Sequence, residues 1–392
     1  MRTFARFFIG FLTISCVVYG SDQVERKEIS PGVVYEEITK KEIPLKIHVI
    51  SVDLTREDIS IAVRAARGLR KLSELADEEE KRGGKVVGGI NGDYFAHFGS
   101  TPLGIEIVDG ILKRPPNIRS AFLVNHRNEV LITATEMTSA IILSNGATFE
   151  PAVTNRWAKR GYSGLFSVDV PKNWEPPVDS TCAWLKPTEP IIVNKSFEAK
   201  VTKIKSDPAW VDLGDSPILL IEPTKKAELL NGKLAVGDTV KVRLEVRGIK
   251  GQIMQAIGGG PRMVRDGKKS VEDVAEQMGG HQVYGDEPRV GIGYTKDGRT
   301  VKLFAVDGRV NDSVGTSLDK LADIMIEQGI WQGMAEDGGG SISMITGTKR
   351  DDLVTRAQGS GVHDNERRIS NALMILQKPA NTAKSGPNNS AP

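Results

Sequence analysis

The chain has 392 residues, with 52 Lys and Arg against 50 Asp and Glu, and therefore carries a formal charge of only +2. This balance provides neither a basic surface for nucleic acid nor an acidic tail, and 39% hydrophobic residues are typical of a globular protein. With only two cysteines, the chain cannot form a disulfide scaffold or a multi-cysteine zinc site. Glycine is more frequent than the average share of about 7%, with 41 glycines among the 392 residues, and these glycines are clustered.

The pattern of the first 20 residues predicts an export signal, because the positive charge of Arg2 precedes an apolar stretch that is shorter than a membrane-spanning helix needs. We expect cleavage after Gly20 and a periplasmic or secreted protein with no stable membrane span. A retained N-terminal anchor and a lipid on Cys16 are the alternatives. After cleavage Cys182 would be the only cysteine left, so it would be buried or free and could not form an internal disulfide.

Residues 21–84 predict N-terminal strands and one helix that lead into the core. Apolar runs indicate strands at 43–52 and 59–63. Between residues 69 and 76, Leu and Ala recur at helical spacing, and Gly83 begins the glycine pair that ends this helix.

Beyond residue 84 the chain mostly predicts short strands. Two Asp-Gly pairs are strong signals for tight hairpin turns. They are Asp109-Gly110, between strands at 105–108 and 111–113, and Asp297-Gly298, between strands at 291–294 and 300–306. A further strand pair is expected at 121–124 and 130–134.

Residues 150–215 are rich in Pro and Trp and predict irregular loops with short strands, and we treat 150–250 as a possible internal lobe. A helix is expected from Thr316 to Gly329, with Asp319 completing a capping box. A shorter helix is expected to begin near Ser270 and to stop at the glycine pair 279–280. The simplest organisation is one large α+β domain over residues 85–376, with a strand-rich mixed sheet core, a few helices and a disordered tail at 377–392.

Four clusters place polar side chains beside glycine. They occupy residues 88–95, 257–262, 306–309 and 336–341, and the first three follow predicted strands. Glycine at a strand end lets a ligand or another backbone approach closely, so each cluster is a candidate site. The alternative for each cluster is a tight turn whose Asp or Asn caps the local backbone.

Several familiar sites are not supported by the sequence. The Gly258-Gly259-Gly260 run is followed by Pro261 and strand-like residues rather than a helix, so the dinucleotide-binding fingerprint fails. No P-loop or Gly-x-Ser-x-Gly elbow is present, and the five histidines have no metal-ligand spacing, although His97 could line a site. Carboxylates and arginines remain the better candidates, for glycosidic cleavage and for phosphate binding respectively.

Six motifs occur in a characteristic order. They occupy residues 91–95, 256–267, 288–293, 306–309, 337–341 and 366–373. This series resembles the phosphodiester glycosidase family over roughly residues 85–376, with a weaker match at 153–156. The resemblance implies a phosphodiester glycosidase-like domain that cleaves a sugar C1–O–phosphate bond. One departure is Glu336, which stands where the family has an apolar residue and adds a second carboxylate beside Asp337.

Site roles follow from this resemblance and from residue chemistry. We expect Asp337 to act as nucleophile or base, with Asp307 or Glu366 as its partner. The candidates for binding the phosphate are Arg289, Arg309 and Arg367. We expect Asn91 and Asp93 to hold sugar hydroxyls or to orient a catalytic group. The candidates for substrate contact or close approach of the backbone are Gly259, Gly260, Gly338, Gly339 and Ser341. The alternative for each Asp–Arg combination is a buried structural ion pair.

The sequence therefore predicts an exported hydrolase that releases a sugar and a phosphomonoester. The alternative is a non-catalytic envelope protein that binds phosphate-containing glycans or assists exopolysaccharide assembly. We expect no cofactor and no nucleic-acid partner, and the sequence leaves open a divalent cation between Asp93, Asp307 and Asp337. The sugar, its aglycone and the oligomeric state are not determined by these motifs.

Overall fold

The computed structural model describes residues 15–19, 22–96, 100–155, 160–167, 174–359 and 361–378. Most of the expected signal peptide and C-terminal tail lies outside these residues, as do His97 and Arg156. Residues Ser15–Tyr19 form strand β1, which pairs antiparallel with β2. None of the helices in the described ranges is long and apolar enough to cross a membrane.

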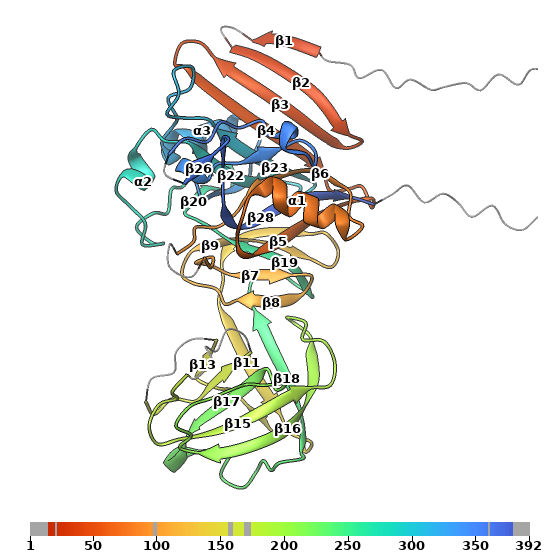
Figure 1. The fold of residues 1–392 in the computed structure, drawn as a ribbon, viewed down its shortest axis with the longest axis vertical. Coiled ribbons are helices and arrows are strands. Elements are labelled where there is room, and N and C mark those ends of the chain that lie inside the picture. The colour runs from red at the N-terminus through yellow and green to blue at the C-terminus, as the bar shows by residue number, and fades with distance from the viewer. Residues whose placement is uncertain are drawn as a thin grey trace, which may run out of the picture.

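A nine-stranded antiparallel sheet forms the upper part of the molecule (Figure 1). Its strands, in spatial order, are β1 (Ser15–Tyr19), β2 (Asp22–Ser30), β3 (Val33–Lys40), β4 (Leu45–Asp53), β23 (Thr300–Val306), β22 (Arg289–Tyr294), β24 (Gln332–Glu336), β20 (Arg262–Arg265) and β21 (Lys268–Lys269). Because β4 pairs with β23, the N-terminal strands share one sheet with β23 and β24, which lead into the glycine clusters at 306–309 and 336–341.

Two smaller sheets and one strand pair complete the core. The four-stranded sheet has the order β25 (Met344–Ile345), β6 (Val86–Asn91), β28 (Ile369–Gln377) and β5 (Ile59–Arg70). The five-stranded sheet has the order β10 (Val130–Ala134), β9 (Ser120–Asn125), β19 (Ile253–Gly258), β7 (Glu106–Val108) and β8 (Ile111–Arg114). The separate pair is β26 (Val362–His363) with β27 (Glu366–Arg367).

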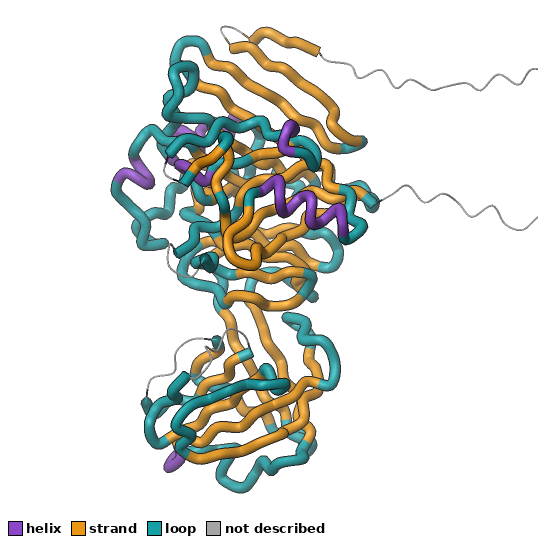
Figure 2. Tube along the Cα trace, in the orientation of Figure 1, coloured by secondary structure: helices purple, strands orange, loops and turns teal. Residues whose placement is uncertain are grey.

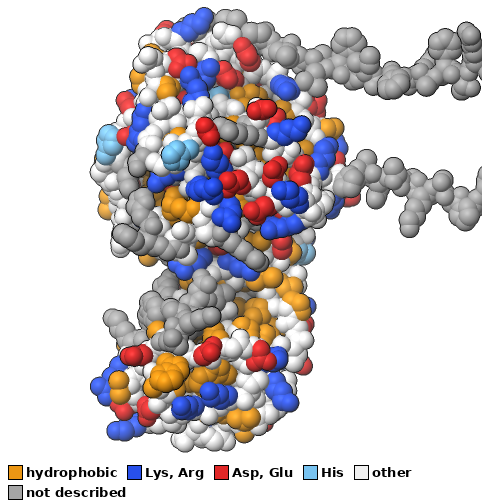
Figure 3. Space-filling model, viewed as in Figure 1, with side chains coloured by type: hydrophobic (Ala, Val, Ile, Leu, Met, Phe, Trp, Pro, Cys, Tyr) orange, Lys and Arg blue, Asp and Glu red, His pale blue; other side chains and the backbone are white. Residues whose placement is uncertain are grey.

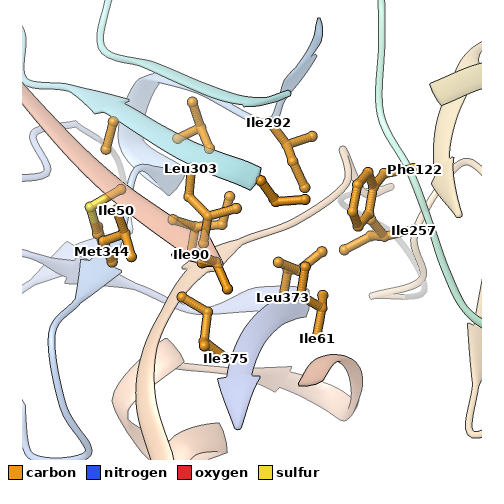
Figure 4. Packing of buried hydrophobic residues seen from close by; sticks show 14 of the residues in the cluster. Ile50, Ile61, Ile90, Phe122, Ile257, Ile292, Leu303, Met344, Leu373 and Ile375 are labelled. Carbon is orange, nitrogen blue, oxygen red and sulfur yellow. The ribbon is translucent and has the colours of Figure 1, made fainter. Parts of the chain in front are cut away.

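A single apolar cluster joins these three sheets. Leu303 of β23, Ile90 of β6 and Phe122 of β9 are fully buried members of it (Figure 4). Burial of this apolar surface is the main favourable contribution to folding. It also fixes where the strand ends of the different sheets meet.

Most of the regular structure in the described residues is strand, and helices are few (Figure 2). They are α1 (Leu72–Lys81), the one-turn α2 (His281–Tyr284) and α3 (Leu318–Glu327), with 3-10 turns η1 (Thr224–Lys226), η2 (Gly339–Ser341) and η3 (Arg350–Asp352). Helix α3 packs Leu321 and Met325 into a second apolar cluster with strands of the nine-stranded sheet.

Two helix predictions need correction. The N-cap of α3 is Ser317 rather than Thr316, because its side chain accepts a hydrogen bond from the backbone of Lys320. The helix expected between Ser270 and Gly279 is a series of turns, and α2 begins only after Gly280. Those turns bring Glu276 inward, where its buried carboxylate accepts hydrogen bonds from Ser120 and from the backbone of Arg262.

An eight-stranded sheet, drawn in yellow to green at the lower end of Figure 1, accounts for residues 137–246. Its strand order is β12 (Thr148–Phe149), β11 (Met137–Ile142), β18 (Thr239–Val246), β16 (Ser196–Ser206), β15 (Ser180–Pro187), β17 (Ile218–Pro223), β14 (Gly164–Phe166) and β13 (Val153–Thr154). We call residues 137–246 the lobe. It has an apolar cluster of its own, which includes Phe197 and Leu220.

The lobe is more regular than its composition predicts. Strand β16 has 11 residues, in which buried Phe197, Ala199 and Val201 alternate with exposed Glu198 and Lys200. This period of two is the signature of a half-buried strand. The lone thiol of Cys182 is buried in the lobe, and burial raises its pKa to about 12.

Candidate active site

Three antiparallel strands place the site at one edge of the nine-stranded sheet. Strand β22 begins at Arg289, which pairs with Val306 at the end of β23, and the next residue pairs with Glu336 at the end of β24. The Asp-Gly corners that follow β23 and β24 therefore lie on either side of Arg289. The fourth glycine cluster thus follows a strand as well, contrary to the sequence expectation.

A cavity of about 380 Å³ lies at this edge. It is lined by Tyr94, His281, Glu287, Arg289, Arg309, Asp337, Gly338, Gly339, Gly340 and Arg367. The structure thus brings together Asp337, the three predicted phosphate-binding arginines and two of the predicted glycines. We call this cavity the arginine pocket.

The backbone of Asp337 is held in place by Asn91 and Gly92. The Asp337 amide donates to the Gly92 carbonyl at 3.0 Å, and the Asn91 side-chain amide donates to the Asp337 carbonyl at 2.7 Å. The other side-chain atom of Asn91 accepts from the Ser343 amide at 2.9 Å. Asn91 therefore ties the end of β6 to the Asp337 corner and does not line the arginine pocket.

The carboxyl of Asp337 has a perturbed pKa. Burial raises it from 3.8 to about 6, while a hydrogen bond from Ser341 and the charge of Arg367 oppose the rise. Ser341 thus supports Asp337 rather than lining the pocket. A carboxyl that titrates this close to neutral pH can exchange a proton during turnover.

The three arginines are anchored in different ways. Arg289 is buried and donates to the carbonyls of Thr316 at 2.9 Å and Gly285 at 2.7 Å, and burial lowers its pKa. The guanidinium of Arg367 lies 5.5 Å from the centre of the Phe95 ring, a cation–π distance. These contacts hold the guanidinium groups at the wall of the pocket.

Arg309 is oriented by Glu287, which the sequence analysis did not identify. Its Nε donates to Glu287 Oε2 at 2.6 Å, and His281 Nε2 lies 2.6 Å from Glu287 Oε1. The pKa of Glu287 lies below its ordinary value. Burial alone would raise this pKa, but the hydrogen bonds from Arg309 and His281 outweigh the effect of burial. Glu287 directly precedes the predicted motif at 288–293, and this adjacency was the available signal.

Asp307 does not reach the arginine pocket. Its carboxylate accepts from the backbone and side chain of Arg356 at 3.0 and 2.8 Å, and His48 Nε2 lies 3.5 Å away. Burial raises its pKa, but His48 and Arg356 together lower it below the ordinary value. The predicted catalytic partner is therefore the buried member of an ion pair with Arg356, whose side chain is 34% exposed.

Glu366 also faces away from the pocket. Its carboxylate accepts from the Ser73 amide at 2.8 Å and from the Ser73 hydroxyl at 2.7 Å, at the first turn of α1. Such a contact gives a hydrogen-bond acceptor to a backbone amide that has none within the first turn of the helix. The next residue, Arg367, lines the pocket, so the motif at 366–373 contributes its arginine and not its glutamate.

Asp93 and Glu336 lie behind the pocket and are both 2% exposed. Asp93 Oδ2 accepts from the Gly104 amide at 2.6 Å, and burial raises its pKa to about 7. Burial and the charges of Asp93 and Asp337 raise the pKa of Glu336 well above its ordinary value. The extra carboxylate at position 336 thus points away from the arginine pocket and into the interior.

Two other predicted residues, Gly259 and Gly260, pack against buried carboxyls. A Cβ on Gly259 would lie 2.8 Å from Glu336 Oε2, and one on Gly260 would overlap the carboxyl of Glu276. Their role in the structure is close approach, not contact with the pocket. Within the described part of the chain, no group of three or more His, Cys, Asp or Glu side chains has the geometry of a metal site.

Comparisons with known proteins agree with this architecture. No curated protein matches the chain. A solved structure of a hypothetical protein from Synechocystis is 17% identical with a TM-score of 0.67, over 94% of this chain and 68% of that one. A Burkholderia pseudomallei protein named as exported is 16% identical with a TM-score of 0.57, over 85% of this chain and 74% of that one. At these identities the likeness concerns the fold alone.

A third similar structure is the catalytic domain of zebrafish N-acetylglucosamine-1-phosphodiester alpha-N-acetylglucosaminidase auto-inhibited by its pro-peptide. It is 15% identical with a TM-score of 0.45, over 94% of this chain and 83% of that one. Residues 193–376 match the model of the phosphodiester glycosidase family. The match includes Arg289, Arg309 and Asp337, whereas the motif at 91–95 lies outside it. The resemblance inferred from the motifs is thus confirmed over residues 193–376, where the chain is similar to the phosphodiester glycosidase family.

Proposed function

We propose that the protein is an exported hydrolase that cleaves a sugar C1–O–phosphate bond and releases a free sugar and a phosphomonoester. The observation that carries this proposal is the arginine pocket, where a carboxyl with a pKa of about 6 faces the same cavity as three guanidinium groups. Export rests on the expected signal at residues 1–20.

The arginines would bind the phosphate of the substrate. A phosphodiester carries one negative charge, and a guanidinium stays charged and can donate two parallel hydrogen bonds to phosphate oxygens. As the C1–O bond breaks, negative charge builds up on the departing phosphate. Arg289, Arg309 and Arg367 would stabilise that charge, and the leaving group therefore needs less protonation than a sugar hydroxyl does.

Asp337 would act at C1 of the sugar. In the simplest sequence it accepts a proton from water, whose oxygen forms the new bond to C1 while the C1–O bond to phosphate breaks. A carboxylate that attacks C1 directly is the alternative. Either role needs the ionised form, so we expect activity to rise with pH through the pKa of Asp337, near 6.

Glu287, rather than Asp307 or Glu366, is the second carboxyl that lines the pocket with Asp337. The surroundings move the pKa values of these two pocket carboxyls in opposite directions, which is typical of groups with different roles. Glu287 stays ionised and fixes Arg309 and His281 at the pocket wall. It is therefore a positioning residue for the phosphate-binding arginine.

The test uses the protein without its signal and a panel of sugar-1-phosphodiesters, including nucleotide sugars. The expected products are a reducing sugar and a phosphomonoester in equal amounts, and Asp337→Asn should abolish their release. Full activity of Asp337→Asn would overturn the assignment. Saturable binding of the panel without product would instead favour the non-catalytic glycan-binding protein.

A further inference from the structure

His281 lines the arginine pocket, but the reaction outlined above does not use it. It is the first residue of α2, and its side chain is 76% exposed, so it is open to a ligand in the pocket. Its ring Nε2 lies 2.6 Å from Oε1 of the buried Glu287, whose other oxygen accepts from Arg309 at 2.6 Å. One carboxylate therefore holds both the imidazole and a guanidinium at the same wall of the pocket.

The backbone after α2 leaves room for this ring. A Cβ on Gly285 would lie only 2.4 Å from both Nδ1 and Cε1 of His281. Gly285 has an extended conformation, with φ of −73° and ψ of 147°, that any residue can adopt. The space taken by the imidazole, and not the backbone angles, is therefore what favours glycine at this position.

The contact with Glu287 determines how the ring can act. A carboxylate accepts from a nitrogen that carries hydrogen, so Nε2 keeps its hydrogen whether the ring is charged or neutral. Among the described residues, Nδ1 of His281 has no hydrogen-bond partner, so Nδ1 is the nitrogen that gains or loses a proton. An imidazole oriented by a carboxylate in this way is suited to general acid–base catalysis.

The other ionisable side chains that line the pocket are poor acids near neutral pH. Guanidinium groups stay charged, Glu287 is already ionised, and burial raises the pKa of Tyr94. Asp337 must be ionised to act at C1 of the sugar. Histidine, in contrast, ordinarily changes its charge between about pH 5 and pH 8.

The leaving group of the proposed reaction benefits from an acid of this kind. A phosphodiester carries one negative charge, and the departing phosphate gains a second as the C1–O electron pair moves onto its oxygen. A phosphomonoester binds its second proton with a pKa of about 6. A general acid is most effective when its own pKa lies near the working pH, as is typical of histidine.

We propose that His281 is the catalytic acid of this site and gives its Nδ1 proton to the departing phosphate, with Glu287 as its positioning residue. This inference rests on the proposed function. The C1–O electron pair and the His281 proton both go to the phosphate oxygen, while water forms the new bond to C1 and gives a proton to Asp337. The products are the free sugar and a singly charged phosphomonoester, and solvent returns the proton from Asp337 to His281.

Charges of both signs in the pocket act on the ring. Glu287 favours a protonated His281, and so does an ionised Asp337. The positive charges that oppose protonation are those of Arg289, Arg309 and Arg367.

Two carboxylates near α2 are paired with other groups. Asp286 lies 3.1 Å from the ammonium of Lys320, on α3, and Asp273, in the turns before α2, accepts from the Tyr284 hydroxyl at 2.6 Å. In the described part of the chain, Glu287 is therefore the carboxylate that is bonded to His281.

The first test measures anion binding and needs no turnover. Sulfate is the probe, because it stays doubly charged between pH 5.5 and pH 8.5, and the protein is the mature chain with Asp337→Asn, which removes the other pocket group that titrates near neutral pH. By calorimetry, sulfate should bind at least about fivefold more tightly at pH 5.5 than at pH 8.5. His281→Gln should abolish this gain, whereas His126→Gln, outside the arginine pocket, should keep it.

The same gain in His281→Gln, or no sulfate binding at all, would overturn the phosphate contact of His281. Circular dichroism establishes that each variant is folded. If Asp337→Asn does not fold, the comparison is made in the otherwise unchanged chain, where His281→Gln should bind sulfate with a smaller gain at pH 5.5.

The second test is the pH profile of kcat/KM toward a sugar-1-phosphodiester. Activity should fall below the optimum as Asp337 is protonated and above it as His281 loses its proton. His281→Gln should lower kcat/KM by about 10²-fold and should remove the alkaline limb while keeping the acid limb. An alkaline limb that survives in His281→Gln would overturn the acid role.

Two alanine substitutions test the position of the ring. Gly285→Ala changes no charge but displaces the imidazole from Glu287, so it should also remove the alkaline limb. The matched control is Gly279→Ala in the same segment, where a Cβ would meet nothing within 4 Å, and its profile should equal that of the wild type. Equal profiles of the two variants would overturn the positioning role of Glu287.

The tests separate this inference from the proposed function. If sulfate binding depends on His281 but no sugar phosphodiester is cleaved, the proposed function fails and the anion contact of His281 stands. If cleavage occurs and His281→Gln does not change it, the proposed function stands and the acid role of His281 fails.

Discussion

Asp307 and Asp337 occupy equivalent places in neighbouring strands, yet their surroundings differ. Each begins an Asp-Gly corner at the end of a strand in the nine-stranded sheet; Asp307 is fully buried and Asp337 is partly buried at the pocket. Asp307 receives donors from Arg356 and His48, and its pKa falls. Asp337 has fewer donors and faces the arginine pocket, and its pKa rises to about 6.

The difference shows that the balance between burial and hydrogen-bond donors, and not the motif, decides what an Asp-Gly corner does. A carboxylate surrounded by donors stays ionised and stabilises the fold. A carboxyl whose burial outweighs its donors can change its protonation state near neutral pH. The charged side chains visible in Figure 3 are of both signs and interspersed, so surface charge alone does not reveal the pocket.

The largest expected effect is on catalysis by Asp337→Asn. This change keeps the shape of the side chain but removes its ability to accept a proton. We expect kcat/KM toward a sugar-1-phosphodiester to fall by about 10²–10⁴-fold. Steady-state assays check this, with Asp312→Asn, an exposed carboxylate beside Arg356, as the control. Loss of less than tenfold would contradict the assignment of Asp337.

The second effect concerns the stability of Asp307→Asn. This change removes the buried charge that pairs with Arg356, which is 34% exposed and keeps its contact with Asp312, so the free energy of unfolding should fall by about 1–3 kcal/mol at pH 7. Urea unfolding measures the loss. Because the pKa of Asp307 is lowered, the loss should shrink in acid, where the wild-type carboxylate is also protonated. An equal loss at pH 3 and pH 7 would contradict the ion pair between Asp307 and Arg356.

The third effect is the pH dependence of stability that Asp337 contributes. Its folded pKa of about 6 exceeds the ordinary 3.8, so the folded state binds more protons between these values. The free energy of unfolding should therefore fall as pH rises from about 4 to about 6, by up to roughly 3 kcal/mol. Asp337→Asn should flatten this part of the curve in urea titrations. Parallel curves for the two proteins would exclude the raised pKa.

The fourth effect is smaller and concerns Arg367→Lys. Lysine keeps the positive charge but loses the planar fork that can bind phosphate in two places. We expect kcat/KM to fall by about tenfold, mainly through KM, as steady-state kinetics can measure. The matched control is Arg368→Lys, whose side chain pairs with Glu74 at 3.0 Å instead of lining the pocket. Equal effects of both changes would argue against a phosphate role for Arg367.

The smallest effect is expected for Glu366→Gln. Its carboxylate accepts two hydrogen bonds from Ser73 at the start of α1, and the amide can still accept one of them. Thermal unfolding should report a loss of about 1 kcal/mol. The pH profile of activity should not move, because Glu366 does not line the arginine pocket. A shifted profile would restore Glu366 as a catalytic candidate.

Much of the local structure follows from the sequence. Asp109-Gly110 predicts the hairpin of β7 and β8, and both residues adopt the positive φ angles that such a turn requires. The apolar spacing around Leu72 and Leu75 predicts α1. These features depend on neighbours in the chain, so periodicity and turn chemistry are sufficient. The helix expected after Ser270 is wrong because a distant contact, from Glu276 to Ser120, overrides the local pattern.

By itself, the sequence determined the candidate residue types, the order of the motifs and the family they resemble. Only the tertiary structure decided which of the carboxyls faces the arginines. Asp307 and Glu366 receive hydrogen bonds from Arg356 and Ser73, which lie far away in the chain, whereas the donors of Asp337 are its neighbours Gly338 and Ser341. The pKa of a buried carboxyl depends on its donors, on nearby charges such as Arg367 and on burial, and the packing of distant segments decides the last two.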